Sequence, residues 1–214
     1  MQNIRTEVCV IGSGPGGYVA AIRAGQLGKK VVCVEKAAPG GVCLNVGCIP
    51  SKAMISAAKQ WEKLSHLSTM GISVSGQSLD AGKLQDWKSS IVDKLTSGVR
   101  QLIKSAGSQF VSGTATLRDK NTIEVSGPDG NVTITADHII LATGSRPITV
   151  PGFTVDNQRI HDSTGGLSFR SVPRRLTVIG GGYIGLELGI MWRKLGAQVT
   201  VVEFTDQLLP GSDP

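Results

Sequence analysis

Two stretches of this chain follow one pattern, and the second begins 168 positions after the first. In the first stretch, the apolar run 8–11 leads into the glycine-rich segment 12–17, a helix-like segment and a second apolar run closed by Glu35. In the second stretch, the glycine-rich segment 180–185 is followed in the same way by Glu203. The paired positions are Gly12 and Gly180, Gly14 and Gly182, Gly17 and Gly185, Ala21 and Gly189, Gly28 and Gly196, and Glu35 and Glu203. Chance does not explain so many matches, so the chain contains an internal repeat of one supersecondary unit.

Each copy of the repeat predicts a strand–helix–strand unit that binds a dinucleotide. Gly12 permits the tight turn, Gly14 lets a pyrophosphate approach the backbone, and Gly17 lets the helix pack closely on the strand. The pyrophosphate rests on the helix N-terminus, and Glu35 accepts hydrogen bonds from a ribose. The short apolar runs are typical of parallel strands that are buried on both faces. The sequence therefore predicts an α/β fold with two Rossmann-like units.

Composition narrows the class of protein. At 214 residues, the chain is long enough for one large domain or two small ones, and its 28 glycines suit turns between strands and helices. The net charge is +6, but the basic residues are dispersed, which disfavours nucleic acid as a partner. The apolar run 8–11 is too short for a signal peptide or a membrane span. We expect a cytoplasmic protein, or one of the mitochondrial matrix if a transit peptide is missing from this numbering.

A third feature is the segment 40–52, which places two cysteines five positions apart in a glycine-rich approach to a helix. Proline fits the first turn of a helix, so we expect this helix to begin near Pro50 and to run to about Leu64. Cys48 then lies just outside the helix N-terminus, where unpaired N–H groups favour a thiolate. Cys43 lies upstream in backbone that we expect to be flexible. The arrangement predicts a disulfide that opens and closes during turnover.

Two other uses of these cysteines are disfavoured. A zinc site normally needs four thiolate or imidazole ligands, and no metal is expected here because the remaining candidates are scattered. Cys9 and Cys33 stand in apolar runs and are predicted to be core residues, and the histidines occur singly, at positions 66, 138 and 161. A static structural disulfide is disfavoured because nothing marks the chain as secreted.

The two nucleotide units are predicted to take different cofactors. Because the redox cysteines follow the first unit directly, its nucleotide should exchange electrons with sulfur, which a flavin does. We therefore assign FAD to the first unit and NAD to the second. Glu203 would repel the 2′-phosphate of NADP, and segment 204–209 has no Arg or Lys to attract one. Lys52 lies four positions after Cys48 on the same side of the helix, although on spacing alone it is equally an ordinary solvated lysine.

The region between the units predicts a helical hairpin and a β-meander. After the cysteine helix, Ser78 or Asp80 is expected to cap a long helix that runs to about Ala106. One apolar stripe along this helix indicates a core contact or an intersubunit seam; it comprises Leu84, Trp87, Ile91, Leu95, Val99 and Leu102. Strands are expected at 110–117, 122–125, 132–135 and 138–142, with a hairpin turn at 127–130, and the strand at 138–142 is expected to be buried. We place an FAD-binding domain at residues 1–149 and the start of an NAD-binding domain at 150–214.

Four motifs together resemble the class I pyridine nucleotide–disulfide oxidoreductase family. They are GSGPGGY at 12–18, GGVCLNVGCIPSK at 40–52, ATGSRP at 142–147 and GGGYIGLE at 180–187. Within the family the chain is most similar to the lipoamide dehydrogenases, because glutathione and trypanothione reductases usually carry a lysine where this chain has Ser51. Mercuric reductases share much of the cysteine motif and remain an alternative.

The resemblance implies a role for individual residues. Cys43 would be the interchange thiol that meets dihydrolipoamide, and Cys48 would lie against the flavin as a charge-transfer thiolate. Lys52 would lie near the flavin N5 and pair with Glu187. Tyr183 would lie near the nicotinamide pocket, unless it is an aromatic residue of the core. The implied FAD contacts are Gly12, Gly14, Pro15, Gly16, Gly17, Glu35, Lys36, Gly41, Val42, Lys52, Thr143, Gly144 and Ser145. The implied NAD contacts are Gly180, Gly182, Tyr183, Ile184, Gly185, Glu187 and Glu203.

Members of the family are considerably longer than this chain. They complete both nucleotide units and end in a dimerisation domain, which supplies a His–Glu base to the partner subunit of a homodimer. We therefore expect this sequence to be the N-terminal part of an enzyme of cell redox homeostasis that oxidises dihydrolipoamide with NAD through FAD. Its substrate would sit on a lipoyl domain of a 2-oxo acid dehydrogenase or glycine cleavage complex. The alternative is a flavin- or nucleotide-binding module without turnover.

Overall fold

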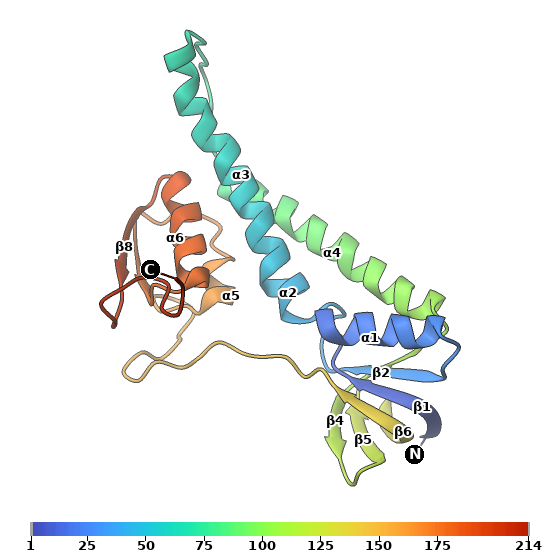
Figure 1. Ribbon diagram of the computed structural model, residues 1–214. Coiled ribbons are helices and arrows are strands. Elements are labelled where there is room, and N and C mark those ends of the chain that lie inside the picture. Colours follow the sequence, from blue (N-terminus) through green and yellow to red (C-terminus); the bar gives the residue numbers. More distant parts are fainter. Residues whose placement is uncertain (1, 214) are drawn as a thin grey trace. The chain divides into compact units, whose positions relative to one another are not determined.

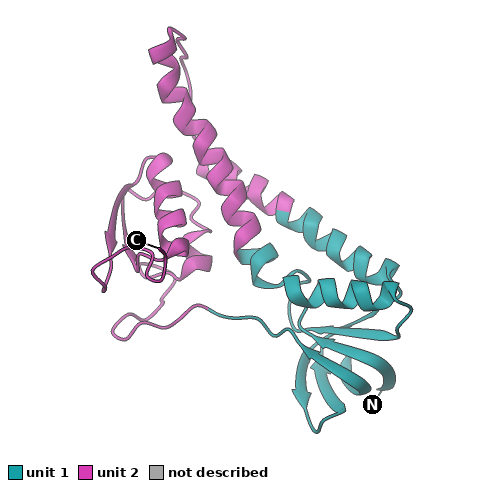
Figure 2. Cartoon of the chain, in the orientation of Figure 1, with its two compact units in different colours: residues 1–46, 92–146 teal, residues 47–91, 147–214 magenta. Residues whose placement is uncertain are grey.

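The computed structural model describes residues 2–213, and Figure 1 labels most of their helices and strands. They form two compact units, one of residues 2–46 and 92–146 and the other of residues 47–91 and 147–213 (Figure 2). The expected α/β class is confirmed. The division into domains at 149/150 stays a prediction.

The first unit is built on one six-stranded sheet with the order β3-β2-β1-β6-β5-β4. The strands β1, β2, β3 and β6 run parallel, and β5 is antiparallel to both β4 and β6. The bounds are β1 (Gln2–Ile11), β2 (Val31–Glu35), β3 (Gln109–Ser112), β4 (Thr114–Leu117), β5 (Thr122–Gly127) and β6 (Gly130–Leu141). In the register, Cys9 lies opposite Val32 on one side and Ile139 on the other.

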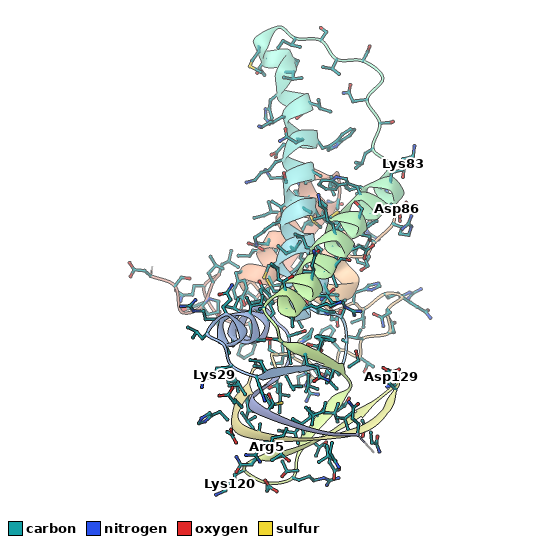
Figure 3. The ribbon with its side chains drawn as sticks, turned by 90° about the vertical axis from the view of Figure 1, so that its right-hand side faces the viewer. Arg5, Lys29, Lys83, Asp86, Lys120 and Asp129 are labelled. Atoms are coloured by element: carbon teal, nitrogen blue, oxygen red, sulfur yellow. The ribbon has the colours of Figure 1, made fainter. Side chains whose placement is uncertain are left out.

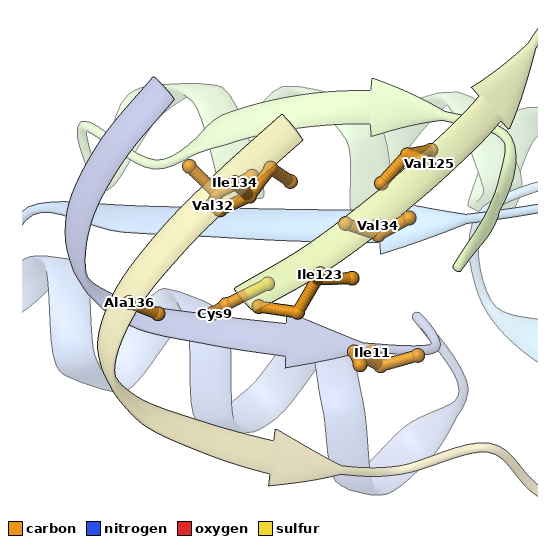
Figure 4. Close-up of a cluster of buried hydrophobic side chains, with 8 residues drawn as sticks. All are labelled: Cys9, Ile11, Val32, Val34, Ile123, Val125, Ile134 and Ala136. Carbon is orange, nitrogen blue, oxygen red and sulfur yellow. The ribbon is translucent and has the colours of Figure 1, made fainter. Parts of the chain in front are cut away.

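This sheet curls over itself to enclose a core (Figure 4). Val32 and Val34 of β2 share a buried cluster with Ile123 and Val125 of β5, although β1 and β6 lie between them in the sheet order. The curl requires a glycine at position 113, where φ is +152° and a Cβ atom would lie 2.6 Å from Val125 Cγ1. The single strand expected at 110–117 is therefore wrong, because Gly113 divides it into β3 and β4.

Strand β6 also differs from the prediction. The segments 132–135 and 138–142 were expected to be separate strands, but they belong to one strand, which the expected turn at 127–130 joins to β5. The second half was expected to be buried, yet Leu141 is 62% exposed. Within residues 2–213, β5 pairs with β6 only as far as Thr135, so the later part of β6 has a strand beside it on the β1 side alone.

Helices cover the other face of the sheet (Figure 1). The helix α1 (Pro15–Gln26) packs there and ends before Gly28, whose φ of +79° fits the expected helix stop. The long helix α4 (Ala81–Ser105) begins as predicted, because Asp80 Oδ1 accepts a hydrogen bond from Lys83 N at 3.0 Å. Its C-terminal part contributes Val99 and Ile103 to the core. The predicted apolar stripe of α4 is only partly buried: Trp87, Leu95 and Leu102 are exposed.

The second unit holds the cysteine helix and the second glycine turn. Besides residues 81–91 of α4, its elements are α3 (Cys48–His66), the 3-10 helix η1 (Leu67–Met70), α5 (Ser163–Gly166), β7 (Arg175–Ile179), α6 (Tyr183–Lys194) and β8 (Gln198–Val202). The strands β7 and β8 are parallel and form a two-stranded sheet. Met54 of α3 and Met191 and Trp192 of α6 are buried in one cluster, so α3 packs along α6. Trp192 Nε1 also donates to Gly166 O at 2.8 Å.

Charged side chains are spread over the surface of both units. Of the residues labelled in Figure 3, Arg5, Lys29, Lys120 and Asp129 belong to the first unit, and Lys83 and Asp86 belong to the second. Arg5 Nη2 lies 3.0 Å from Asp137 Oδ1, and Lys29 Nζ lies 2.8 Å from Glu7 Oε1. All four side chains are exposed, so these ion pairs contribute little to stability.

By length and composition alone, the helical stretch Gly41–Met70 could cross a membrane. Inside this stretch, however, Met54 and Ala58 are fully buried against residues of α6. A helix that packs into a protein core satisfies the same criterion of length and apolar content.

Candidate active site

The first glycine turn follows β1 and is closed by contacts that leave no room for a side chain. Gly12 has φ of +98°, and a Cβ atom on it would lie 2.1 Å from Ala142 O. A Cβ atom on Gly17 would lie 1.8 Å from Gly12 O. The turn is anchored by a hydrogen bond from Gly12 N to Val34 O at 2.8 Å. Glycine at these positions therefore holds α1, β1 and the end of β6 in close contact.

The N-terminus of α1 is open to a ligand. Gly14 is the N-cap residue, no side chain caps the helix, and Pro15 lacks an N–H group. Nothing lies within 4 Å of the position a Cβ atom would take on Gly16. The free N–H groups and positive dipole of such a terminus suit a phosphate. The first unit thus has the cradle that a pyrophosphate requires.

Glu35 fixes the shape of this turn. Its Oε2 accepts hydrogen bonds from Ser13 N at 2.8 Å and Ser13 Oγ at 2.9 Å, and its Oε1 accepts from Ala37 N at 3.0 Å. The side chain is buried. A carboxylate has about four acceptor positions, so capacity remains for the ribose hydroxyls that the sequence predicts. The contribution of Ser13 was missed, although it occupies the variable position between the first two glycines.

The second glycine turn repeats these hydrogen bonds. Gly180 N donates to Val202 O at 2.8 Å, and Gly181 N donates to Glu203 Oε2 at 2.5 Å. Thr205 N and Thr205 Oγ1 both donate to Glu203 Oε1 at 2.9 Å. These hydrogen bonds, led by those from the Thr205 and Gly181 amides, lower the pKa of Glu203 to about 2. The residue is therefore a carboxylate at neutral pH.

The cysteine segment is attached to the first glycine turn. Gly40 N donates to Ser13 O at 2.9 Å, and a Cβ atom on Gly41 would lie 2.6 Å from Gly14 Cα. Immediately after this contact, the chain forms the short helix α2 (Gly41–Val46), which contains Cys43. The expected flexible backbone at Cys43 is therefore wrong. The close approach of Gly41 and the burial of Leu44 hold the segment in place.

Helix α3 begins at Cys48, two residues before Pro50, with Gly47 as its N-cap residue. Cys48 is thus the first residue of the helix and not a residue outside it. The helix continues to His66, slightly beyond the expected end. Cys48 is exposed and Cys43 is half-buried. The predicted roles of both cysteines stay predictions.

Lys52 and Glu187 form an ion pair between α3 and α6. Lys52 Nζ lies 2.6 Å from each carboxylate oxygen of Glu187. The pairing that the family resemblance implies is present, and the position of the pair near a flavin stays a prediction. The side chains are 58% and 39% exposed, so the pair adds little to stability.

The remaining predicted contact residues are accessible to ligands. Tyr183 is 71% exposed at the start of α6, so the alternative that it packs in the core is wrong. Thr143, Gly144 and Ser145 follow β6 and are exposed, and the φ of Gly144 is +75°. The carboxyl ends of parallel strands are where ligands bind in such folds. Lys36, Val42 and Ile184 are exposed as well.

The other two cysteines are confirmed as core residues. Cys9 and Cys33 are fully buried. Burial raises the pKa of the Cys9 thiol to about 11 and that of the Cys33 thiol to about 12. Both remain protonated and inert at neutral pH. Within residues 2–213, no group of three or more His, Cys, Asp or Glu is placed to hold a metal ion.

Comparisons with known proteins agree with this geometry. Residues 6–214 match the family model described as pyridine nucleotide-disulphide oxidoreductase. The chain is 52% identical over 208 residues to dihydrolipoyl dehydrogenase of Geobacillus stearothermophilus, with coverage of 97% of this chain and 44% of the relative. It is 49% identical to the Bacillus subtilis enzyme of the same name, with coverage of 97% and 44%. The chain therefore spans less than half the length of the curated relatives it matches.

Solved structures show the same similarity. LpdA from Mycobacterium tuberculosis superimposes with a TM-score of 0.88 at 25% identity, over 98% of this chain and 47% of that one. A copper complex of the flavoprotein disulfide reductase RclA from Escherichia coli gives a TM-score of 0.84 at 26% identity, over 98% of this chain and 44% of that one.

Proposed function

Because the chain belongs to the pyridine nucleotide–disulphide oxidoreductase family, we propose that it serves the oxidation of dihydrolipoamide by NAD through FAD and the Cys43–Cys48 disulfide. The observation that carries this proposal is the attachment of the cysteine segment to the first glycine turn, through Gly40 and Gly41. One continuous piece of structure thus contains both Cys43 and the helix N-terminus that would bind the pyrophosphate. The names of the relatives support lipoamide as the substrate.

In the first unit, the turn at Gly14 and Gly16 would hold the FAD pyrophosphate, and Glu35 would accept hydrogen bonds from the ribose. Thr143 and Gly144, at the carboxyl end of β6, would line the same site. When bound, FAD would supply an acceptor for two electrons and a source of hydride for NAD.

The chemistry of the chain itself is thiol–disulfide exchange. A substrate thiolate attacks the Cys43 sulfur, a bond forms between these sulfurs, and Cys48 leaves as a thiolate. The second substrate thiolate then attacks the substrate sulfur of the mixed disulfide, which closes the lipoamide ring and releases the Cys43 thiolate. The substrate loses two electrons to the cysteine pair, and its two protons pass to solvent when its thiols ionise. Lys52 adds a positive charge near the start of α3, four residues after Cys48.

The second glycine turn would hold NAD. Its carboxylate, Glu203, is ionised because its pKa is about 2. A negative charge at this position repels a 2′-phosphate, which supports NAD over NADP. As further parts of the proposal, the enzyme acts as a homodimer in the cytoplasm or mitochondrial matrix, on a lipoyl domain of a 2-oxo acid dehydrogenase or glycine cleavage complex.

The test is to purify the chain, add FAD, remove unbound flavin and record the visible spectrum. The proposal predicts a yellow protein that dihydrolipoamide bleaches and that forms NADH when NAD is added. A Cys43→Ser, Cys48→Ser double variant should stay yellow in dihydrolipoamide. A yellow wild-type protein that is inert to the thiol contradicts the proposal and indicates a flavin-binding module. A colourless protein shows that these 214 residues do not hold FAD by themselves.

A further inference from the structure

The side chain of Asn45, which lies between the two cysteines in sequence, joins three segments of the first unit. Its Nδ2 donates to Gly41 O at 2.9 Å and to Pro39 O at 3.0 Å. Its Oδ1 accepts a hydrogen bond from Thr96 Oγ1 of α4 at 3.1 Å. One amide group therefore ties α2 both to the loop that precedes it and to a long helix.

Helix α2 needs such support, because it has only six residues. Helices this short are unstable in isolation, since the cost of nucleation is not recovered. An asparagine inside a helix also tends to bond to nearby backbone groups, which weakens the helix unless another element holds the side chain. Here the hydrogen bond from Thr96 Oγ1 fixes the side chain of Asn45. Cys43 lies midway between Gly41, which is packed on Gly14, and Asn45, which is bonded to Thr96.

We infer that Asn45, held by Thr96, is a positioning residue that sets the place of the Cys43 sulfur for disulfide exchange. The inference rests on the proposed function, in which Cys43 and Cys48 form the redox disulfide. A disulfide forms within one chain in proportion to the effective molarity of its two thiols, and this quantity falls when either thiol is less well oriented. Loss of the Asn45 hydrogen bonds lets α2 sample other conformations, so the disulfide becomes easier to reduce.

The experiment equilibrates the purified 214-residue chain in glutathione redox buffers, blocks the remaining thiols and quantifies the Cys43–Cys48 peptide by mass spectrometry. For Asn45→Ala we expect the equilibrium constant for disulfide formation to fall about tenfold, which corresponds to a rise of about 30 mV in reduction potential. Thr96→Val should lower the constant about threefold, because it removes one of these hydrogen bonds. Thr96→Ser keeps the hydroxyl and should restore the wild-type value. Asn131→Ala, at an exposed position of β6, is the matched control and should change nothing.

The outcomes separate the inference from the function on which it rests. Constants for Asn45→Ala and Thr96→Val within twofold of wild type would overturn the role of Asn45 while leaving the disulfide intact. If circular dichroism shows that Asn45→Ala does not fold, Thr96→Val decides alone, since it leaves Asn45 bonded to Gly41 and Pro39. A wild-type chain that forms no Cys43–Cys48 disulfide at any glutathione ratio contradicts the proposed function and removes the inference with it.

Discussion

The two glycine turns share their hydrogen bonds but differ in what surrounds them. Both close with a bond from the first glycine to the end of the second strand, and both direct a backbone N–H at the terminal glutamate. Every residue of β2 is buried, whereas β8 is mostly exposed. The first turn sits in a six-stranded sheet and the second in a two-stranded sheet. The residues of each turn therefore determine its hydrogen bonds, whereas the neighbouring strands determine how far β2 and β8 are buried.

The turns also differ in what is built on them. A Cβ atom on Gly14 would lie 3.9 Å from Gly41 Cα, at the start of the cysteine segment, whereas nothing lies within 4 Å of the equivalent position on Gly182. Ser13 donates its hydroxyl to Glu35, but its counterpart, Gly181, has no side chain. A later segment bonds back to each turn, from Gly40 N to Ser13 O in the first and from Leu209 N to Gly181 O in the second, both at 2.9 Å. Only the first of these segments contains cysteines.

Substitution of the first glycine of each turn should give the largest difference in stability between the two units. In Gly12→Ala, strain from positive φ adds to a clash with Ala142 O, and we expect a loss of about 3 to 5 kcal/mol in the free energy of unfolding. Gly180 has a similar φ of +101° but open space, so Gly180→Ala should cost about 1 to 2 kcal/mol. Urea titration of both variants measures the difference. Equal losses would show that backbone strain alone explains the glycines.

Substitution of the glutamate that ends the second strand of each unit should give the next largest difference in stability. Glu35→Gln replaces a buried carboxylate that accepts three hydrogen bonds, and we expect a loss of about 2 kcal/mol in the free energy of unfolding. Glu203 is more exposed than Glu35, so Glu203→Gln should lower the free energy of unfolding by a smaller amount at neutral pH. The pKa of Glu203 is lowered from 4.5 to about 2, so its contribution is present above pH 4.5 and is lost as the pH falls towards 2. Chemical denaturation between pH 2 and 7 should show a flatter acid limb for Glu203→Gln than for wild type, and parallel limbs would refute this account.

The first unit, whose buried strand β2 contains Cys33, should lose stability at alkaline pH. The pKa of Cys33 is raised from 9.0 to about 12, chiefly by burial, so the protonated thiol stabilises the fold below pH 9 and loses this effect as the pH rises towards 12. Each pH unit in this range removes up to about 1.4 kcal/mol. Cys33→Val, which installs the residue found at the matched position 201, should reduce the change in unfolding free energy between pH 8 and 10. An unchanged pH dependence in Cys33→Val would contradict the assignment of this loss of stability to the Cys33 thiol.

The smallest effect concerns the helix position where one unit has Ala21 and the other Gly189. A Cβ atom on Gly189 would make ordinary contacts, 3.4 Å from Val199 Cγ1 and 3.5 Å from Val178 Cγ2. Alanine also favours the helix, so Gly189→Ala should raise the free energy of unfolding by about 0.5 to 1 kcal/mol. Thermal unfolding should show a higher midpoint. A lower midpoint would mean that α6 and its strands are packed more tightly than in the first unit.

The sequence predicts best what depends on local chemistry. The glycine turns, the strand β2, the stop of α1 near Gly28 and the Asp80 cap of α4 all follow from the preferences of a few adjacent residues. The family motifs add the partnership of Lys52 and Glu187, which stand 135 positions apart and have no spacing rule to connect them.

The sequence fails where distant residues decide. The helix α2 depends on contacts with Gly14 and Thr96, so its own six residues do not reveal it. The break at Gly113 depends on the approach of Val125 from another strand. The exposure of Leu141 depends on how far β5 extends beside β6. None of these features leaves a periodic signal in the segment concerned.

In the proposed function, the first glycine turn, and not the second, holds the flavin. Gly14→Ala and Gly182→Ala test it most directly, because each new methyl group fits the folded chain yet projects where a pyrophosphate would lie. Fluorescence titration with FAD should show affinity at least about tenfold weaker in Gly14→Ala and unchanged in Gly182→Ala. Unchanged FAD affinity in Gly14→Ala, or a loss confined to Gly182→Ala, would contradict the account.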